Sequence, residues 1–270
     1  MPVDLGSALV IGQYLPRGSI LHRLDPRTKI LITTGLAVVL FFVPSFLGLG
    51  AFALWMLGLL VVGQIPLGYA LRGLRPLVIL LMLTAFLNTF FAAGDPTPAL
   101  FHLGPLVATW GGLRTGLYVG ARLVLLVLVT SMLTFTTSPV ELTDGLERLL
   151  RPFARIGLPA HELAMMMTIA LRFIPTLLEE TEKIMKAQMA RGADFERGTA
   201  FRRARAFVPV LVPLMVGAFR RSEELALAME ARCYRGGEGR TRMKELRWSM
   251  ADAVAGVLAT AVAVAILRVG

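Results

Sequence analysis

The sequence predicts an all-α integral membrane protein, with about five transmembrane helices and a three-helix cytoplasmic insert before the last span. Hydrophobic residues make up 56% of the 270 residues and charged residues only 17%, and the mean hydropathy is positive. Soluble domains of this length have a more polar composition. The charges are also concentrated, because 19 of the 28 Lys and Arg and 14 of the 18 Asp and Glu lie between Glu141 and Arg247.

This distribution divides the chain into three parts. We expect an N-terminal membrane region over 1–137 with about four transmembrane helices, a cytoplasmic helical region over 138–247, and a C-terminal transmembrane helix over 248–270. The single cysteine, Cys233, excludes an internal disulfide and a cysteine-cluster metal site.

The first apolar run predicts a helical hairpin. Asp25-Pro26 is a helix-start signal, because the carboxylate caps free N–H groups and proline costs nothing at the first helical position. The apolar run 30–62 would be roughly 50 Å long as one helix, against a hydrocarbon core of about 30 Å. The chain must therefore fold back, and Pro44-Ser45 is the expected turn.

Two further spans are expected before the insert. Residues 76–92 predict the third, and the loop 94–111 contains no Lys or Arg, as expected of a loop on the outer side. Residues 112–136 predict the fourth. This segment carries a stripe of small residues at four-residue spacing that lets another helix approach closely, formed by Gly112, Gly116 and Gly120.

The fourth span also contains a charge, Arg122, two to three turns inside the segment. An arginine at such a depth is a candidate functional site. The structural interpretation, which we favour, is that it pairs within the protein or extends to the membrane surface.

The region 138–247 predicts three helices. A capping box formed by Ser138 and Glu141 starts the first, which extends over 139–156 until Gly157 and Pro159 end it. The second, over 160–191, has an apolar stripe, and the pairs Glu179 with Lys183 and Glu182 with Lys186 are expected on its polar side.

The third helix of this region is expected over about 206–232, after a turn at 195–205. A capping-box-like pair, Ser249 with Asp252, then opens the last span. With five spans, the bias of Lys and Arg places the N-terminus and the insert on the cytoplasmic side of the cell membrane and the C-terminus outside.

The sequence gives little support for catalysis or for a bound cofactor or metal. It has no glycine-rich phosphate loop, its three histidines lie on separate segments, and His161-Glu162 lacks the second histidine that a zinc-protease helix needs. The excess Lys and Arg residues are not interleaved with aromatic residues, which argues against nucleic-acid binding. Two alternatives stay open: a membrane-embedded enzyme that uses His161, Glu179 or Glu180, and a single-subunit transporter built around Arg122.

Two short sequences in the insert repeat each other. Met189-Ala190-Arg191-Gly192 and Glu230-Ala231-Arg232-Cys233 each end a predicted amphipathic helix. Arginine and a small residue are ordinary at one helix end. Their repetition indicates a shared role, because small neighbours let the helix end enter a groove and the guanidinium pairs with a carboxylate at two points.

At these residues the sequence resembles the transmembrane T component of energy-coupling factor transporters, a family of ABC-type importers. The resemblance covers essentially the whole chain. It rests on the paired motifs Ala190-Arg191-Gly192 and Ala231-Arg232-Cys233, on the segment Leu21 to Lys29 (LHRLDPRTK), and on Gly239-Arg240-Thr241-Arg242. Cys233 stands where the family often has glycine.

The resemblance implies a non-enzymatic coupling subunit of a membrane protein complex. Its partners would be two ABC ATPase subunits, a substrate-binding S component and the lipid bilayer. The six motif residues would dock on the ATPases, with Arg191 on one and Arg232 on the other. The helices between them would transmit ATP-driven motion to the S component for uptake of a vitamin or related micronutrient.

Overall fold

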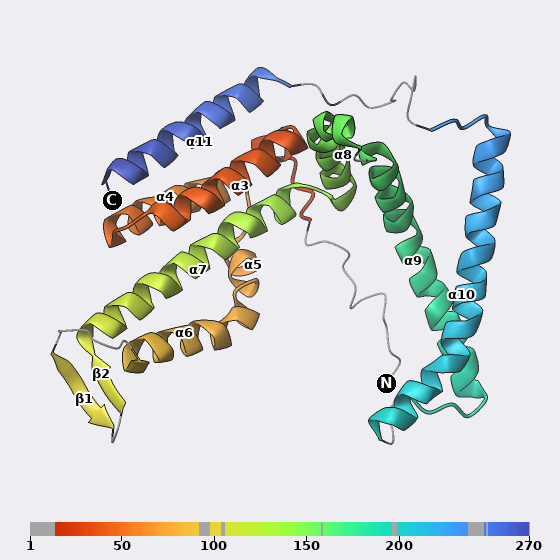
Figure 1. The fold of residues 1–270 in the computed structure, drawn as a ribbon, viewed down its shortest axis with the longest axis horizontal. Helices are drawn as coiled ribbons and strands as arrows, with labels where there is room; N and C mark the ends of the chain where they lie inside the picture. Colours follow the sequence, from red (N-terminus) through yellow and green to blue (C-terminus); the bar gives the residue numbers. More distant parts are fainter. Residues whose placement is uncertain are drawn as a thin grey trace. The chain divides into compact units, whose positions relative to one another are not determined.

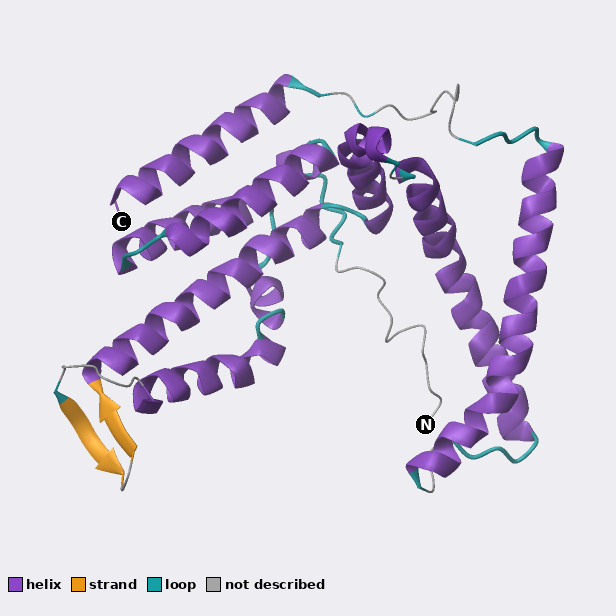
Figure 2. Ribbon diagram, viewed as in Figure 1, coloured by secondary structure: helices purple, strands orange, loops and turns teal. Residues whose placement is uncertain are grey.

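The computed structural model describes residues 14–91, 98–103, 106–157, 159–195, 199–236, 246 and 248–269. They form two compact units, which are described separately. One, the membrane unit, lies within Gly12–Gly145 and Leu246–Gly270, and the other, the helical unit, lies within Leu146–Glu245. Almost all of the regular structure is helical (Figures 1 and 2), which confirms the all-α prediction.

The membrane unit contains most of the elements. In chain order they are α2 (Ile20–Arg23), α3 (Pro26–Phe42), α4 (Phe46–Val62), α5 (Leu67–Arg72), the 3₁₀ helix η1 (Arg75–Leu77), α6 (Val78–Phe91), β1 (Ala99–Leu103), β2 (Leu106–Thr109), α7 (Trp110–Thr136), the start of α8 (Pro139–Leu150) and α11 (Met250–Val269).

The helical unit contains the rest of the insert. It takes in the end of α8, the 3₁₀ helix η2 (Arg151–Ile156), α9 (Ala160–Ala190) and α10 (Ala200–Ala231). The third predicted helix begins at Ala200 and not near residue 206, so the prediction that 195–205 forms a turn is wrong for its second half. Thr199 has the extended backbone of an N-cap residue, and the arginines that follow favour helix.

Short-range signals in the sequence have the predicted outcomes. Ser45 caps α4, and both α3 and α4 pack on α7 and α11, so the chain does fold back at Pro44-Ser45. Asp25 accepts a hydrogen bond from the backbone N–H of Arg27 at 2.9 Å. Ser138 and Glu141 exchange the two hydrogen bonds of a capping box, at 3.2 and 3.3 Å. These bonds join residues two or three positions apart, which explains why the sequence alone predicts them.

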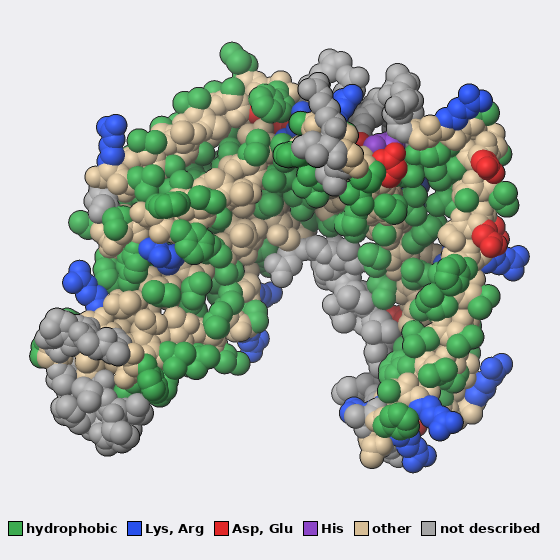
Figure 3. Space-filling model, viewed as in Figure 1, with side chains coloured by type: hydrophobic (Ala, Val, Ile, Leu, Met, Phe, Trp, Pro, Cys, Tyr) green, Lys and Arg blue, Asp and Glu red, His purple; other side chains and the backbone are tan. Residues whose placement is uncertain are grey.

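Helix length and composition support a membrane-spanning chain. Among the described residues, four helical segments are long and apolar enough to cross a bilayer, namely Leu67–Phe91, Trp110–Thr136, Ala160–Ala190 and Met250–Arg268, and α4 is a shorter apolar helix. The third of these is α9, which the sequence assigns to the cytoplasmic insert. Hydrophobic side chains cover much of the visible surface (Figure 3), as expected of helices that face lipid.

The core of the membrane unit lies between α3, α4 and α7. Its fully buried side chains include Leu40 and Val43 at the end of α3, Phe52 of α4, and Val129 and Phe135 of α7. Helix α6 packs along α7, and Gly112 and Gly116 are at their contact, as the small-residue stripe predicts. Gly120 has open space around it and takes no part.

The segment between α6 and α7 differs from the prediction. The sequence predicts a plain loop over 94–111, whereas β1 and β2 form an antiparallel hairpin that pairs Leu103 with Leu106 and His102 with Val107. The strands are too short for a clear alternation of apolar and polar residues, which is the usual sequence signal of a strand.

Candidate functional site

Helix α9 ends in a Schellman motif. The N–H of Ala193 donates to the carbonyl of Gln188 at 3.0 Å, and the N–H of Gly192 donates to the carbonyl of Met189 at 2.9 Å. These are the two hydrogen bonds that define the motif. Gly192 has a φ of +89°, the left-handed conformation that glycine adopts without strain. Arg191 is the last residue before the chain turns.

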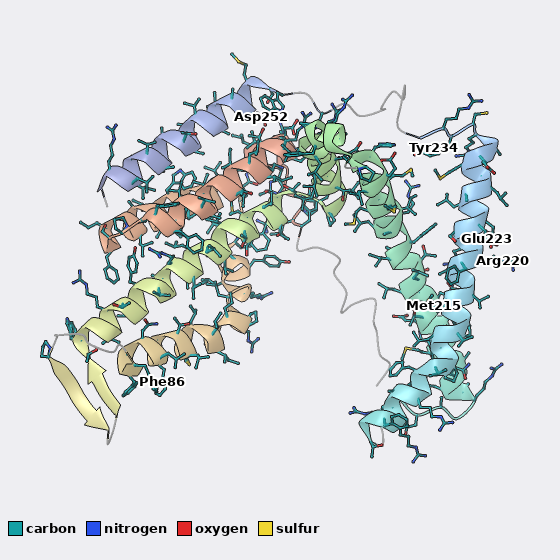
Figure 4. All side chains as sticks on the ribbon, in the orientation of Figure 1. Phe86, Met215, Arg220, Glu223, Tyr234 and Asp252 are labelled. Atoms are coloured by element: carbon teal, nitrogen blue, oxygen red, sulfur yellow. The ribbon has the colours of Figure 1, made fainter. Side chains whose placement is uncertain are left out.

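Helix α10 ends in the same motif. Here the N–H of Tyr234 donates to the carbonyl of Met229 at 3.0 Å, and the N–H of Cys233 donates to that of Glu230 at 2.8 Å. Arg232 occupies the position of Arg191, and Tyr234 lies just beyond the helix end (Figure 4). The sequence repeat therefore folds into a repeat of backbone structure.

The two arginines have nearly the same backbone conformation. Their φ and ψ angles are −88° and 5° for Arg191 and −91° and 15° for Arg232. Cys233 follows with a φ of +57°, a conformation that costs about 1–2 kcal/mol for residues other than glycine. The cysteine thus adopts the left-handed backbone that Gly192 has in the first motif, so the two motifs share one backbone structure.

Both motifs are accessible. Ala190, Arg191 and Gly192 are exposed, and so are Ala231, Arg232 and Cys233. Within the described part of the chain, neither guanidinium forms an ion pair or hydrogen bond. Each helix therefore presents a charged side chain with unused donors, which suits recognition of a carboxylate on another molecule.

An ion pair joins α9 to α10 in the helical unit. The guanidinium of Arg221 lies 2.7 Å from the carboxylate of Glu180. Gly217 makes room for that carboxylate, since a Cβ there would lie 3.1 Å from it. The sequence does not predict this link, because the pairing of two helices is not visible in the periodicity of either. Glu180 therefore contributes to the contact between α9 and α10.

Beside the ion pair, the two helices line an apolar groove of about 310 Å³. Its walls are mainly hydrophobic side chains, including Ile169, Phe173, Leu177, Leu225, Ala226 and Met229. Of the methionines on α9, Met185 is buried, whereas Met166, Met167 and Met189 are exposed. Flexible methionine side chains adapt to different surfaces, which fits a contact with a partner protein.

The residues of the enzyme alternative are not brought together. His161 Nδ1 lies 3.0 Å from the carboxylate of Glu147, on α8. Glu179 and Glu180 follow it on the same helix by 18 and 19 positions, or about 27 Å at 1.5 Å per residue. Of the predicted surface pairs, Lys186 does meet Glu182, at 3.8 Å. The described residues include no cluster suited to a metal ion.

Arg122 has the structural role that we favoured. Its guanidinium donates to the carbonyl of Val43 at 2.9 Å and to the Tyr118 hydroxyl at 2.6 Å, and it lies 4.8 Å from the centre of the Tyr118 ring. Tyr118 also donates to the Val43 carbonyl. Arg122 therefore satisfies the carbonyl group at the C-terminal end of α3, where the hairpin turns.

A reciprocal exchange of residues tests the match between the two helix ends. Cys233→Gly is expected to stabilise the end of α10 by up to about 1 kcal/mol, because glycine adopts a positive φ freely. Gly192→Cys is expected to destabilise the end of α9 by a similar amount. Amide hydrogen exchange of each last turn measures both effects. Equal exchange in the parent chain and in both variants would contradict the assignment of left-handed backbone at these positions.

Known proteins are similar to nearly the whole chain. The CbiQ family, described as cobalt transport protein, matches residues 17–243. The energy-coupling factor transporter transmembrane protein EcfT of Thermosediminibacter oceani is 56% identical over 97% of this chain and 96% of its own length. The EcfT proteins of Acidaminococcus fermentans and Bacillus subtilis are 53% and 45% identical, over 97% and 91% of this chain and 97% and 92% of their own. This chain therefore belongs to the family of energy-coupling factor transporter transmembrane proteins.

Proposed function

We propose that this chain is the non-catalytic coupling subunit of its transporter, and that it binds two ABC ATPase subunits through its two Ala-Arg-small motifs. The observation that carries the proposal is the structural match between the ends of α9 and α10, each with an exposed arginine. Two equivalent contacts suit two ATPases that are identical or closely similar. Arg191 would bind one and Arg232 the other.

Each arginine suits an acidic cleft. The guanidinium is always charged and forms two parallel hydrogen bonds with a carboxylate. The backbone around it is already held by the Schellman hydrogen bonds, so little ordering is required on binding. The Glu180–Arg221 ion pair links the two helices, which helps motion at either motif to move them together.

The remaining partner is a substrate-binding S component in the membrane. The exposed methionines Met166, Met167 and Met189 support a contact on α9 that adapts to a protein surface. On this proposal, ATP binding closes the ATPase pair, the coupling helices shift, and the S component tips to release a vitamin or related micronutrient inside. The N-terminus and the insert are then cytoplasmic, and the C-terminus is outside.

The test is affinity purification of the full chain in mild detergent, followed by identification of the proteins that accompany it. We expect two ATPase copies and one S component, and ATP-dependent uptake when the assembly is reconstituted in liposomes. Solute flux or enzymatic turnover by the chain alone would favour the alternatives and overturn the proposal.

A further inference from the structure

The segment Leu21 to Lys29 lies far from both docking motifs along the chain, yet it contributes two buried charged residues of the membrane unit, and a third comes from α11. Asp25, Lys29 and Asp252 are only 6%, 7% and 5% exposed. Asp252 lies in the first turn of α11, and Figure 4 shows it beside the start of α3. Buried charges are retained where they are paired and hydrogen-bonded, so their partners indicate what the segment does.

Lys29 holds the point where the chain leaves the membrane unit for the insert. Its amino group donates to the carbonyl of Thr136 at 2.9 Å, in the last turn of α7, and to the carbonyl of His22 at the same distance. Thr136 is two residues before Ser138, where the capping box of α8 begins. The carboxylates that interact electrostatically with Lys29 are Glu141, Asp252 and Asp25.

Two residues of the same segment hold the point where the chain returns. The Arg27 guanidinium donates to the carbonyl of Leu246 at 2.9 Å. The backbone N–H of Asp25 donates to the Asp252 carboxylate at 2.7 Å. The other oxygen of that carboxylate accepts from the backbone N–H and hydroxyl of Ser249, at 2.8 and 2.7 Å, so Asp252 caps its own helix while it binds α3.

A packing contact supplements these hydrogen bonds where the chain leaves the membrane unit for the insert. Gly145 of α8 lies against α3, and a Cβ at this position would be 3.0 Å from the Cβ of Pro26 and 3.2 Å from the Ile30 side chain. Both ends of the insert are thus attached to one nine-residue segment, by hydrogen bonds that each join a side chain to a backbone group.

We propose that Asp25, Arg27, Lys29 and Asp252 form a rigid joint that attaches both ends of the insert to the start of α3. This joint converts movement of the coupling helices into movement of the membrane helices. This rests on the proposed coupling function. Without the joint, the connections at 136–138 and at 246 and 248–252 move relative to α3 when the ATPases close. ATP is then hydrolysed with little transport. These are positioning residues, since none contacts an ATPase motif.

The test compares Lys29→Met with Arg23→Met in the complete transporter. Arg23 lies in the same segment and carries the same charge, but it is exposed and forms no hydrogen bond or ion pair within the described structure. For Lys29→Met we expect ATPases to co-purify at the parent yield and transport per ATP hydrolysed to fall at least tenfold. Arg23→Met is expected to stay within twofold of the parent.

A second pair separates geometry from general loss of stability. Asp252→Asn keeps an oxygen that accepts from Asp25 and is expected to retain more coupling than Asp252→Ala. The comparison of the two Asp252 variants also tests the joint if the Lys29→Met protein does not accumulate. If Lys29→Met and Asp252→Ala both keep the parent chain's ratio of transport to ATP hydrolysis, the proposed joint is refuted. Equal loss in Asp252→Asn and Asp252→Ala would also contradict it.

A measurement on the chain alone keeps this test independent of the proposed function. Amide hydrogen exchange in detergent is expected to quicken at both 136–141 and 248–254 in Lys29→Met and Asp252→Ala, and at neither in Arg23→Met. Parent-like exchange at both connections would overturn the joint even if no ATPase binds the chain. Absence of ATPases from the parent complex would instead overturn the proposed function.

Discussion

Replacement of both Arg191 and Arg232 by alanine is expected to release the ATPase subunits from the complex. Each arginine is an exposed side chain with free donors on a preordered helix end. Loss of such an anchor typically costs about 2 kcal/mol or more, roughly a thirtyfold loss in affinity at each contact. Each single variant is expected to weaken one contact, and the double variant to lose both, as measured by the ATPase yield on affinity purification.

Arg220→Ala is the matched control for this experiment. Arg220 lies on α10 and is mostly exposed, and in the described part of the chain its one ion pair is with Glu224, one turn away on its own helix, at 3.1 Å. An exposed pair of this kind contributes at most about 1 kcal/mol, so the ATPases are expected to remain bound. Transport should fall in parallel with docking, while the isolated S component still binds its ligand. Recovery of the ATPases at the parent yield with the double variant would refute the docking assignment.

The second large effect is expected at the contact of α6 with α7. In Gly112→Ala, the new Cβ would overlap the backbone carbonyl of Asn88 and lie 3.0 Å from that of Thr89. Backbone atoms cannot move aside as a flexible side chain can, so the helices must separate. Overpacking of this kind costs about 1–3 kcal/mol or more. A lower thermal unfolding midpoint in detergent is the expected result.

Gly120→Ala tests the same stripe where no helix approaches. Nothing lies within 4 Å of a Cβ at Gly120, and alanine is the better helix former by up to about 1 kcal/mol. Its unfolding midpoint is therefore expected to stay equal or to rise. Equal losses of stability in the two alanine variants would contradict the close packing of α6 on α7.

Most of the correct predictions from sequence concern interactions between near neighbours. The capping boxes at Ser138 and Ser249, and the turn at Pro44, involve residues at most three or four positions apart, so their residue types suffice. The errors have a different cause. The sequence signals for the β1–β2 hairpin and for the early start of α10 are weak. Polar residues lie beside each segment, and they favour a loop in a prediction from sequence alone.

By itself, the sequence determines that this is a helical membrane protein with a charged insert that carries two matching Ala-Arg-small motifs. These properties follow from composition, hydrophobic periodicity and helix-end chemistry, all of which act along the chain. Only the tertiary structure decides that Arg122 binds Val43, that Glu180 binds Arg221, and that Lys29 and Asp252 hold the two ends of the insert. These contacts join residues more than 40 positions apart, and only the packing of helices brings such residues within hydrogen-bond distance.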